Sequence, residues 1–274
     1  MSKNLSSAAQ QLFDSEVKHA FQSAGSLRDT VTIRNNVVGD IYKFRKMGKG
    51  LANQKPSQAD VTPMDVSHSL ISCTLGNWNA PEYTDIFDQA EVNFDEKTEL
   101  ASTIAGALGR RLDQLIIDAL GAESSPAGTI VHGSGGMTLA KIITSSKHLN
   151  DKGVPSGDRH IAVSADGLED LLNLATITSS DYNSVKALMA GDLNTFMGFN
   201  WHVIESRTEG GLPYGSSTWE GFAWHKSAIG LAIGLDISTE VNYVAQKTSW
   251  LCNGVMKAGA VSRDGDGIVS VSYQ

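Results

Sequence analysis

The clearest pattern along the chain is a stripe of apolar residues at helical spacing between residues 93 and 121. Its members are Leu100, Ile104, Leu108, Leu112, Leu115, Ile116 and Ala119. Asn93 and Glu96 stand where an N-cap and its N3 partner belong, and Gly121 follows the last apolar position. The pattern predicts one amphipathic helix of about 27 residues, which would span about 40 Å.

A second amphipathic helix is predicted over residues 5–24, where apolar side chains recur every three or four positions and Gly25 follows. An isolated helix of ~20 residues is marginal in water. Its apolar face therefore needs a partner surface, either on the chain's own core or on a neighbouring molecule.

Residues 30–80 have the character of strands, because β-branched and aromatic residues are frequent and Ile71, Cys73 and Leu75 alternate with polar residues. The segment KMGKGLANQKPSQADVTPM separates two strand-like runs and has no periodicity. A loop of about 20 residues is unusual inside a compact domain and usually has a function. We therefore expect a long excursion between two strands.

The remainder, residues 125–274, mixes both periods and predicts an α+β fold. Helices are expected near 137–150 and through Leu168 and Leu171. Strands are expected at 160–164, 199–206, 220–225, 237–246, 249–261 and 267–272. The tail SRDGDGIV predicts a tight hairpin turn, because Tyr273 stands where a calcium loop needs a glutamate.

Composition narrows the class of protein. The chain is 41% hydrophobic and 19% charged, which excludes a disordered chain. Its net charge of −8 argues against a protein that binds nucleic acid over its whole surface. Cys73 and Cys252 are too few for a disulfide framework and are expected to be small buried residues. No signal peptide and no apolar run of membrane-spanning length is present, so we expect a protein of the reducing cytoplasm, or of something assembled there, without membrane contact.

No constellation for catalysis stands out. The glycine-rich segment HGSGGM lacks the third glycine of a dinucleotide fingerprint, because Thr138 occupies that position, and no Walker lysine follows. No histidines pair at helical spacing as zinc ligands would. We therefore expect no enzyme activity, no cofactor and no metal ion.

The charges are unevenly distributed. Residues 31–60 hold six basic and two acidic residues, whereas residues 61–99 hold eight acidic residues and one lysine. Such asymmetry favours electrostatic matching, either within one chain or between copies.

Taken in order, these features resemble the major capsid proteins of tailed bacteriophages. Asp85 and Asp88 match a D-x-x-D motif before a long helix. Ala107, Gly109, Arg110 and Asp113 match an A-x-G-R-x-x-D signature within it. Asp181, Tyr182, Asn183, Gly191, Gly198 and Phe199 match a later block, and the segments WHKSAIGLAIG and GAVSRDGDGIVSV resemble the family's final strands. Each motif is short, but together they cover nearly the whole chain.

The resemblance implies the Hong Kong 97-type capsid fold. Residues 1–29 would then be the N-arm, residues 30–80 the E-loop and residues 81–128 the P-domain with its spine helix. Residues 129–235 would form most of the axial A-domain, and residues 236–274 the closing strands of the A- and P-domains.

The family's function implies hexamers and pentamers of one protein in an icosahedral shell around double-stranded DNA, assembled in the host cytoplasm and located in the virion. A portal protein would be a partner, and a decoration protein is left open. Many members carry an N-terminal scaffolding segment that a protease removes. Because the predicted arm helix begins close to Met1, a separate scaffolding protein is implied.

In this fold the E-loop of one subunit lies across the P-domain of the next. The resemblance therefore predicts an intersubunit contact between basic residues of the excursion and acidic residues ahead of and within the long helix. The basic set is Lys43, Arg45, Lys46, Lys49 and Lys55; the acidic set is Asp85, Asp88, Glu91, Asp95, Glu96 and Glu99. The alternative is that the lysines simply solvate a loop.

Two other functions stay open at this point. The same fold could form an encapsulin-type compartment in a cell, which would hold a packaged enzyme instead of DNA. A soluble α+β enzyme is the third interpretation, and it would be a monomer or a small oligomer.

Overall fold

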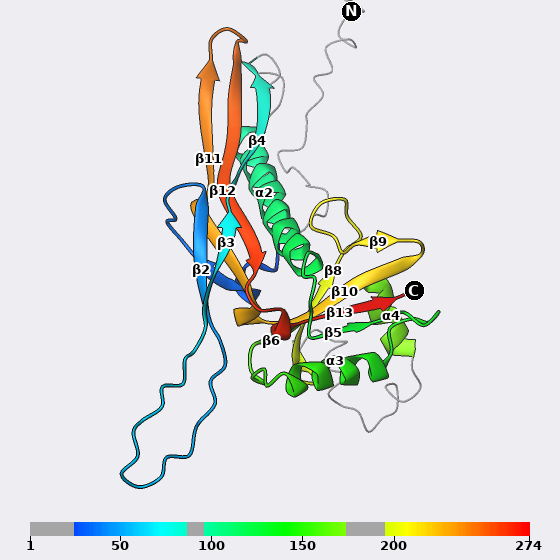
Figure 1. Cartoon of the computed structure of the whole chain (residues 1–274). Helices are drawn as coiled ribbons and strands as arrows, with labels where there is room; N and C mark the ends of the chain where they lie inside the picture. Colours follow the sequence, from blue (N-terminus) through cyan, green and yellow to red (C-terminus); the bar gives the residue numbers. More distant parts are fainter. Residues whose placement is uncertain (1–24, 87–95, 174–194) are drawn as a thin grey trace, which may run out of the picture.

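The computed structural model describes residues 25–86, 96–173 and 195–274. Two sheets and a long helix form the body, from which a narrow hairpin projects (Figure 1). The predicted helix over residues 5–24 and the Asn93 cap lie outside the described residues.

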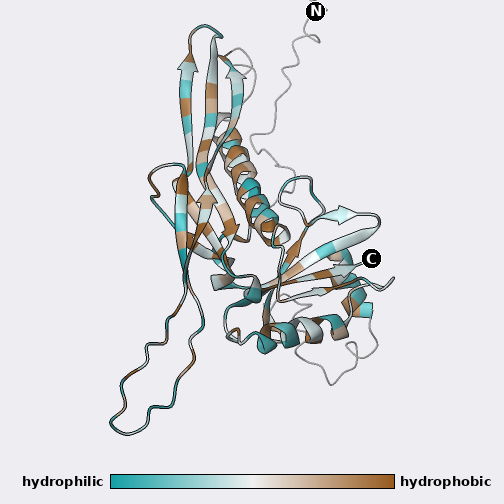
Figure 2. Cartoon of the chain, in the orientation of Figure 1, coloured by the Kyte–Doolittle hydropathy of each residue, from teal (hydrophilic) through white to brown (hydrophobic). Residues whose placement is uncertain are grey.

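The first sheet is long and has four strands in the order β1 (Thr32–Arg34), β11 (Ile229–Val244), β12 (Ser249–Ser262), β4 (Gly76–Asp85). β1 pairs in parallel with Gly230–Ala232, and the other pairs are antiparallel. Buried residues concentrate at the start of β11, whereas hydrophobic and hydrophilic residues alternate along its outer half (Figure 2). The outer half is therefore a two-sided ribbon, and the inner half belongs to the core.

Helix α2 (Glu96–Gly121) runs along one face of this sheet. Ile104 and Leu108 are buried, while Leu100 and Leu115 are partly buried against the same core. Gly254 of β12 permits the close approach, because a Cβ there would lie 2.3 Å from Ile104. The predicted apolar stripe thus faces the sheet.

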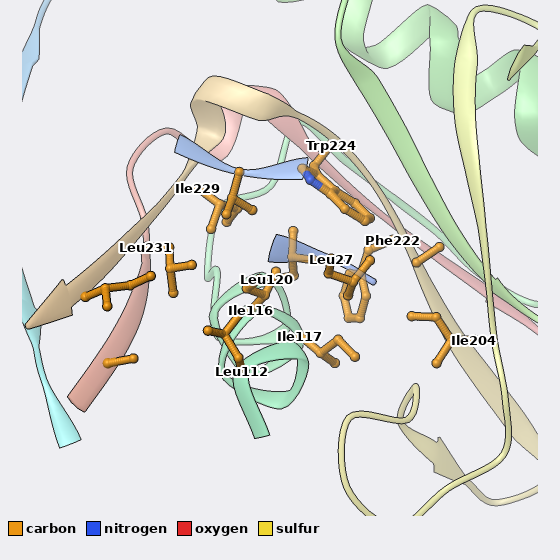
Figure 3. Close-up of a cluster of buried hydrophobic side chains, with 14 of the residues drawn as sticks. Leu27, Leu112, Ile116, Ile117, Leu120, Ile204, Phe222, Trp224, Ile229 and Leu231 are labelled. Carbon is orange, nitrogen blue, oxygen red and sulfur yellow. The ribbon is translucent and has the colours of Figure 1, made fainter. Parts of the chain in front are cut away.

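The most buried part of this core surrounds the C-terminal turns of α2. Leu112, Ile116, Ile117 and Leu120 lie in one cluster with Leu27, with Ile229 and Leu231 of β11, and with Phe222 and Trp224 of the second sheet (Figure 3). One cluster therefore joins the helix to both sheets.

Truncating the stripe should destabilise the protein measurably. Leu108 is 3% exposed, so Leu108→Ala should lower the free energy of unfolding by about 2–5 kcal/mol through lost burial and a cavity. Denaturant unfolding measures this change. The exposed Ile143→Ala in a different helix is the control, and a loss below ~0.5 kcal/mol for Leu108→Ala would contradict the assigned face.

The second sheet is mixed and covered on both faces. Its order is β5 (Gly128–Ile130), β13 (Ile268–Tyr273), β10 (Thr218–His225), β6 (Arg159–Ser164), β8 (Phe199–Ile204), β7 (Thr195–Phe196), and β9 (Tyr214–Gly215) pairs with β10. Helices α3 (Leu139–Asp151) and α4 (Ala165–Asn173) pack with Ile161 and Val163 on one face. On the other face Ala162 joins the core around α2. This double cover explains why every residue of β6 is buried.

The projecting hairpin consists of β2 (Ile41–Met47) and β3 (His68–Thr74), paired antiparallel from Ile41–Thr74 to Met47–His68. At its base Phe44, Cys73 and Leu75 pack against Ala232 of β11. The predicted excursion, residues 48–67, extends beyond the paired strands (Figure 1).

Two expectations about local structure were wrong. β11 begins at Ile229 rather than 237, since its first residues are buried on both faces and show no alternation. The tail SRDGDGIV is a crossover and not a hairpin turn: β12 and β13 belong to different sheets, and a short 3₁₀ helix, η4 (Gly265–Gly267), joins them. Cys73 and Cys252 are buried, free cysteines, as expected.

Candidate assembly surface

The β2–β3 hairpin and the loop at its far end carry several exposed large apolar side chains. Leu51 is 83% exposed and Val61 is 76% exposed, and Met47, Met64 and Leu70 are exposed as well. Monomeric proteins seldom present so many apolar groups on one projection. The hairpin is therefore a candidate for burial against another molecule.

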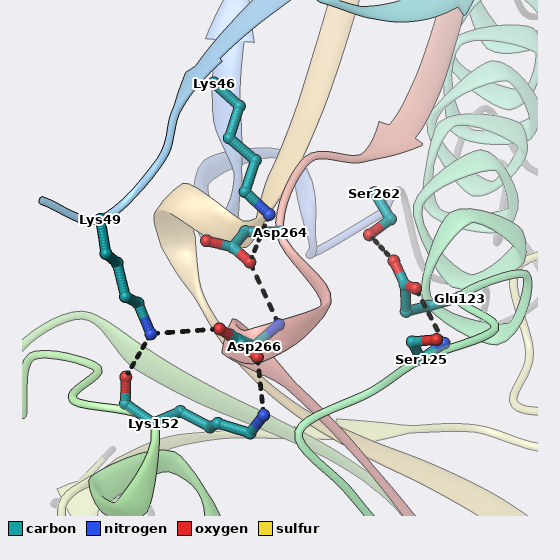
Figure 4. A network of polar contacts seen from close by, with 8 residues as sticks. All are labelled: Lys46, Lys49, Glu123, Ser125, Lys152, Ser262, Asp264 and Asp266. Carbon is teal, nitrogen blue, oxygen red and sulfur yellow. Dashed lines mark hydrogen bonds and ion pairs between the residues drawn. The ribbon is translucent and has the colours of Figure 1, made fainter. Parts of the chain in front are cut away.

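Ion pairs fix the base of this hairpin to the body. Lys46 Nζ lies 2.9 Å from Asp264 Oδ1, and Lys49 Nζ lies 3.3 Å from Asp266 Oδ2. Lys152 of the loop after α3 contacts the other oxygen of Asp266 at 3.0 Å (Figure 4). The bond from Lys152, helped by the bond from Lys49, lowers the pKa of the Asp266 carboxyl below its ordinary value, although burial acts in the opposite direction. Strand β2, η4 and the end of α3 are thus held together.

The predicted basic and acidic sets do not meet within one chain where both are described. Lys46 and Lys49 pair with Asp264 and Asp266, which the sequence had suggested only as turn residues. Lys43, Arg45 and Lys55 are exposed. Asp85 ends β4 opposite Ser249, and Glu99 lies in the first turns of α2. Asp88, Glu91, Asp95 and the side chain of Glu96 lie outside the described residues, so the intersubunit contact stays a prediction.

Asp113, one of the motif positions, is a fully buried carboxylate on α2. It accepts hydrogen bonds from the backbone N–H groups of Ser26 at 2.9 Å and Leu27 at 3.0 Å. The Arg207 guanidinium donates to it at 3.0 Å and also to the Gly210 carbonyl at 2.8 Å. Asp113 therefore ties the N-terminal segment and the loop after β8 to the long helix.

Gly25 makes this junction tight. Its φ is +95°, and a Cβ there would lie 2.7 Å from the Gly109 carbonyl oxygen. Only glycine tolerates both the backbone angle and the approach. The position predicted as a helix stop is thus also the point where the N-terminal segment contacts α2.

A pair of histidines lies inside the second sheet. His160 Nδ1 is 3.1 Å from His202 Nε2, and both rings stack near Trp224. Burial, and next the neighbouring His202, lowers the pKa of His160 from its ordinary 6.5 to about 4. Burial also lowers the pKa of His202. The two rings therefore share their hydrogen bond as neutral imidazoles at neutral pH.

This pair should make the fold sensitive to acid. A depressed pKa means that the unfolded chain binds more protons between about pH 6.5 and 4, so stability is complete above 6.5 and is lost as the pH falls toward 4. We expect a loss of roughly 2 kcal/mol from this source. His160→Gln should reduce the pH dependence of denaturant unfolding, whereas the exposed His68→Gln should leave it unchanged. Identical pH profiles for the two variants would contradict the role of the pair.

The glycine-rich segment before α3 binds a side chain of its own chain. The Lys141 ammonium donates to the carbonyls of His132, Gly135, Gly136 and Ser272 at 2.8–3.2 Å. The segment is thus a turn around a lysine of the same chain.

Among the described residues no group of histidine, cysteine and acidic side chains could hold a metal ion. In the same part of the chain no helix is both long and apolar enough to cross a membrane.

A family model described as phage capsid protein matches residues 5–274, which is almost the entire sequence. The chain belongs to this phage capsid protein family. It is a major capsid protein, a structural component of the virion capsid rather than an enzyme, and it takes its place in a shell built from copies of itself.

Solved phage capsids have the same fold. The capsid of cyanophage P-SCSP1u is 15% identical over 100% of this chain and 95% of its own, with a TM-score of 0.74. The structure titled Mycobacterium phage Che8 is 17% identical over 95% and 96%, with a TM-score of 0.71. The capsid of Ralstonia phage GP4 is 10% identical over 97% and 95%, with a TM-score of 0.74. The expected Hong Kong 97-type fold is confirmed. A comparison with curated sequences finds no significant match.

Proposed function

We propose that this capsid protein assembles into the hexamers and pentamers of an icosahedral shell that encloses double-stranded DNA, and that assembly takes place in the host cytoplasm. The observation that carries the proposal is the exposed β2–β3 hairpin, which presents Leu51 and Val61 far from the subunit's own core. A projection of this kind gains stability only when another surface covers it.

The same proposal assigns the family's domains to segments of this chain. Residues 1–29 act as the N-arm, residues 30–80 as the E-loop and residues 81–128 as the P-domain. Residues 129–235 form most of the A-domain, and residues 236–274 supply closing strands to the A- and P-domains. A separate scaffolding protein and a portal protein act as assembly partners.

Electron microscopy of the purified protein, expressed alone and with its scaffolding partner, tests the proposal. Closed icosahedral particles with hexameric and pentameric clusters support it, and DNA in particles from infected cells supports the enclosure of the genome. A chain that stays monomeric under every assembly condition, or shells that hold a packaged enzyme, would overturn it.

The charge contact between subunits has a test of its own. Lys46 and Lys49 are unsuitable, because reversing them would place glutamates beside Asp264 and Asp266 of the same chain. Lys43→Glu with Lys55→Glu reverses two exposed charges without breaking an ion pair within the described residues. We expect a folded subunit whose particle yield falls several-fold at low salt, since like charges then face each other at every repeat.

The control for this variant is Lys147→Glu, an exposed lysine on α3. It changes the net charge in the same direction away from the hairpin, and its particle yield should stay close to that of the unaltered chain. Equal yields for the hairpin variant and the control at low ionic strength would show that the hairpin lysines only solvate a loop.

A further inference from the structure

A basic pocket lies between two unpaired strand edges. β1 is the edge strand of the four-stranded sheet and β2 is an edge of the hairpin. The pocket between them has a volume of about 460 Å³, within the usual range for small-molecule sites. Thr32, Arg34, Tyr42, Lys43, Phe44, Arg45 and Arg263 line it.

Four of the seven lining residues are cations and none is acidic. Acidic residues near these cations along the chain are already engaged, since Asp264 pairs with Lys46, Asp266 with Lys49 and Lys152, and Asp40 with Lys257. Within the described residues, Arg34, Lys43, Arg45 and Arg263 form no ion pair. Four cationic residues that form no ion pair within the described part of the chain therefore line one concavity of a chain whose net charge is −8.

Contacts within the chain hold Arg263 in place before any ligand binds. Its guanidinium lies over the Phe44 ring, 5.1 Å from the centroid, and its backbone N–H donates to Ala228 O at 2.7 Å. Its Nε is buried and has no hydrogen-bond partner among the described residues.

The edge of β2 supplies further donors. Leu75 N–H donates to Asp40 O, and Gly48 N–H donates to Ser67 O. The backbone N–H and C=O groups of the even-numbered residues from 40 to 48 therefore point toward β3. In an antiparallel pair the alternate residues face the other way. The backbone N–H groups of Lys43 and Arg45 therefore point to the free edge, where these residues line the pocket.

We propose that this pocket binds a phosphate group through Arg34, Arg45 and Arg263, with Lys43 as a fourth positive charge. Guanidinium forks match phosphate oxygens in pairs. A single carboxylate would leave most of the positive charge uncompensated, whereas a phosphate ester, a diphosphate or consecutive phosphodiesters carry more negative charge and more acceptors. The ligand is either a small soluble phosphate or the backbone of DNA.

Titration calorimetry of the full, unassembled chain with pyrophosphate at constant ionic strength tests the proposal. Arg34→Gln with Arg45→Gln should raise the Kd at least tenfold. The control, Lys55→Gln with Lys147→Gln, makes the same charge change at exposed sites outside the pocket and should change the Kd less than twofold. Arg263→Lys keeps the charge but loses the fork, and it should weaken binding several-fold.

A second experiment distinguishes the two possible sources of the phosphate group. Fluorescence anisotropy with a short DNA duplex measures affinity against salt concentration. If DNA is the ligand, removing two arginine contacts should reduce the magnitude of the log–log salt slope by roughly 1–2. If only pyrophosphate binding responds to the substitutions, the ligand is a small phosphate.

Three outcomes would overturn the proposal: no binding of either probe, equal binding by the arginine variant and the control, or citrate binding as tightly as pyrophosphate. Circular dichroism of each variant shows that the fold is retained. Because the measurements use unassembled chains, their outcome is independent of shell formation.

Discussion

Replacing Asp113 by asparagine is expected to lower the free energy of unfolding by about 3–5 kcal/mol, the usual cost of breaking one side of a buried ion pair. The carboxylate is 0% exposed and receives two backbone N–H groups and one guanidinium. An asparagine would turn an NH₂ group toward at least one of these donors and remove the buried partner of the Arg207 guanidinium, which would keep only its ion pair with the exposed Glu205. Denaturant unfolding of the subunit measures the loss.

Asp118→Asn is the matched control on the same helix. Asp118 is exposed and accepts one bond from Gln114 at 2.6 Å, so its replacement should cost less than about 0.5 kcal/mol. Adding Arg207→Met to Asp113→Asn should recover part of the loss, because the guanidinium that has lost its buried partner is removed. A loss below about 1 kcal/mol for Asp113→Asn would show that the buried carboxylate does not hold these segments together.

Shortening the hairpin should abolish shell formation while leaving the subunit folded. Residues 49–66 are exposed except for Ala59 and Val66, which are half-buried, so the core loses little when they are removed. Joining Gly48 to Ser67 through Asn-Gly continues the observed register and closes a two-residue turn on a hydrogen-bonded pair. Closing a shorter loop costs less entropy, so the free energy of unfolding should stay the same or rise by roughly 1 kcal/mol.

Sedimentation and electron microscopy of the shortened chain should then show subunits or small oligomers instead of particles. The control keeps the loop length and replaces Gln54 and Gln58, both exposed, by serine; it should assemble normally. Particles from the shortened chain in normal yield would refute the role of the hairpin in assembly.

The sequence predicted the elements that have a single buried face. The Leu108 stripe of α2 and the alternation at Ile71 and Cys73 each follow a periodicity that burial on one side creates. It failed at the start of β11, which is buried on both faces and shows no alternation, and at η4, where a Gly-rich turn connects different sheets. The pattern of hydrophobic and polar residues shows which face of an element is buried, but it does not show which sheet a strand joins.

The site residues were harder to predict for the same reason. Lys46 and Lys49 stand out as basic, but their partners Asp264 and Asp266 lie more than 200 positions away and resemble turn residues. Asp113 was visible as a motif position within an apolar stripe, and a charged residue on a buried helix face is a signal for a partner. His160 and His202 carried no signal in the sequence, because their pairing depends on the register between β6 and β8.

The sheet order has a consequence for the timing of synthesis. β1 pairs with β11 roughly 200 positions later, β4 pairs with β12, and β5 pairs with β13, so the contact order is high and folding is correspondingly slow. At the usual pace of translation the ribosome needs on the order of 20 s to reach β13. Before β12 is made the first sheet is incomplete, and before β13 is made the second sheet is incomplete. A chain that ends ahead of these strands therefore lacks a closed core, and we expect it not to enter the shell.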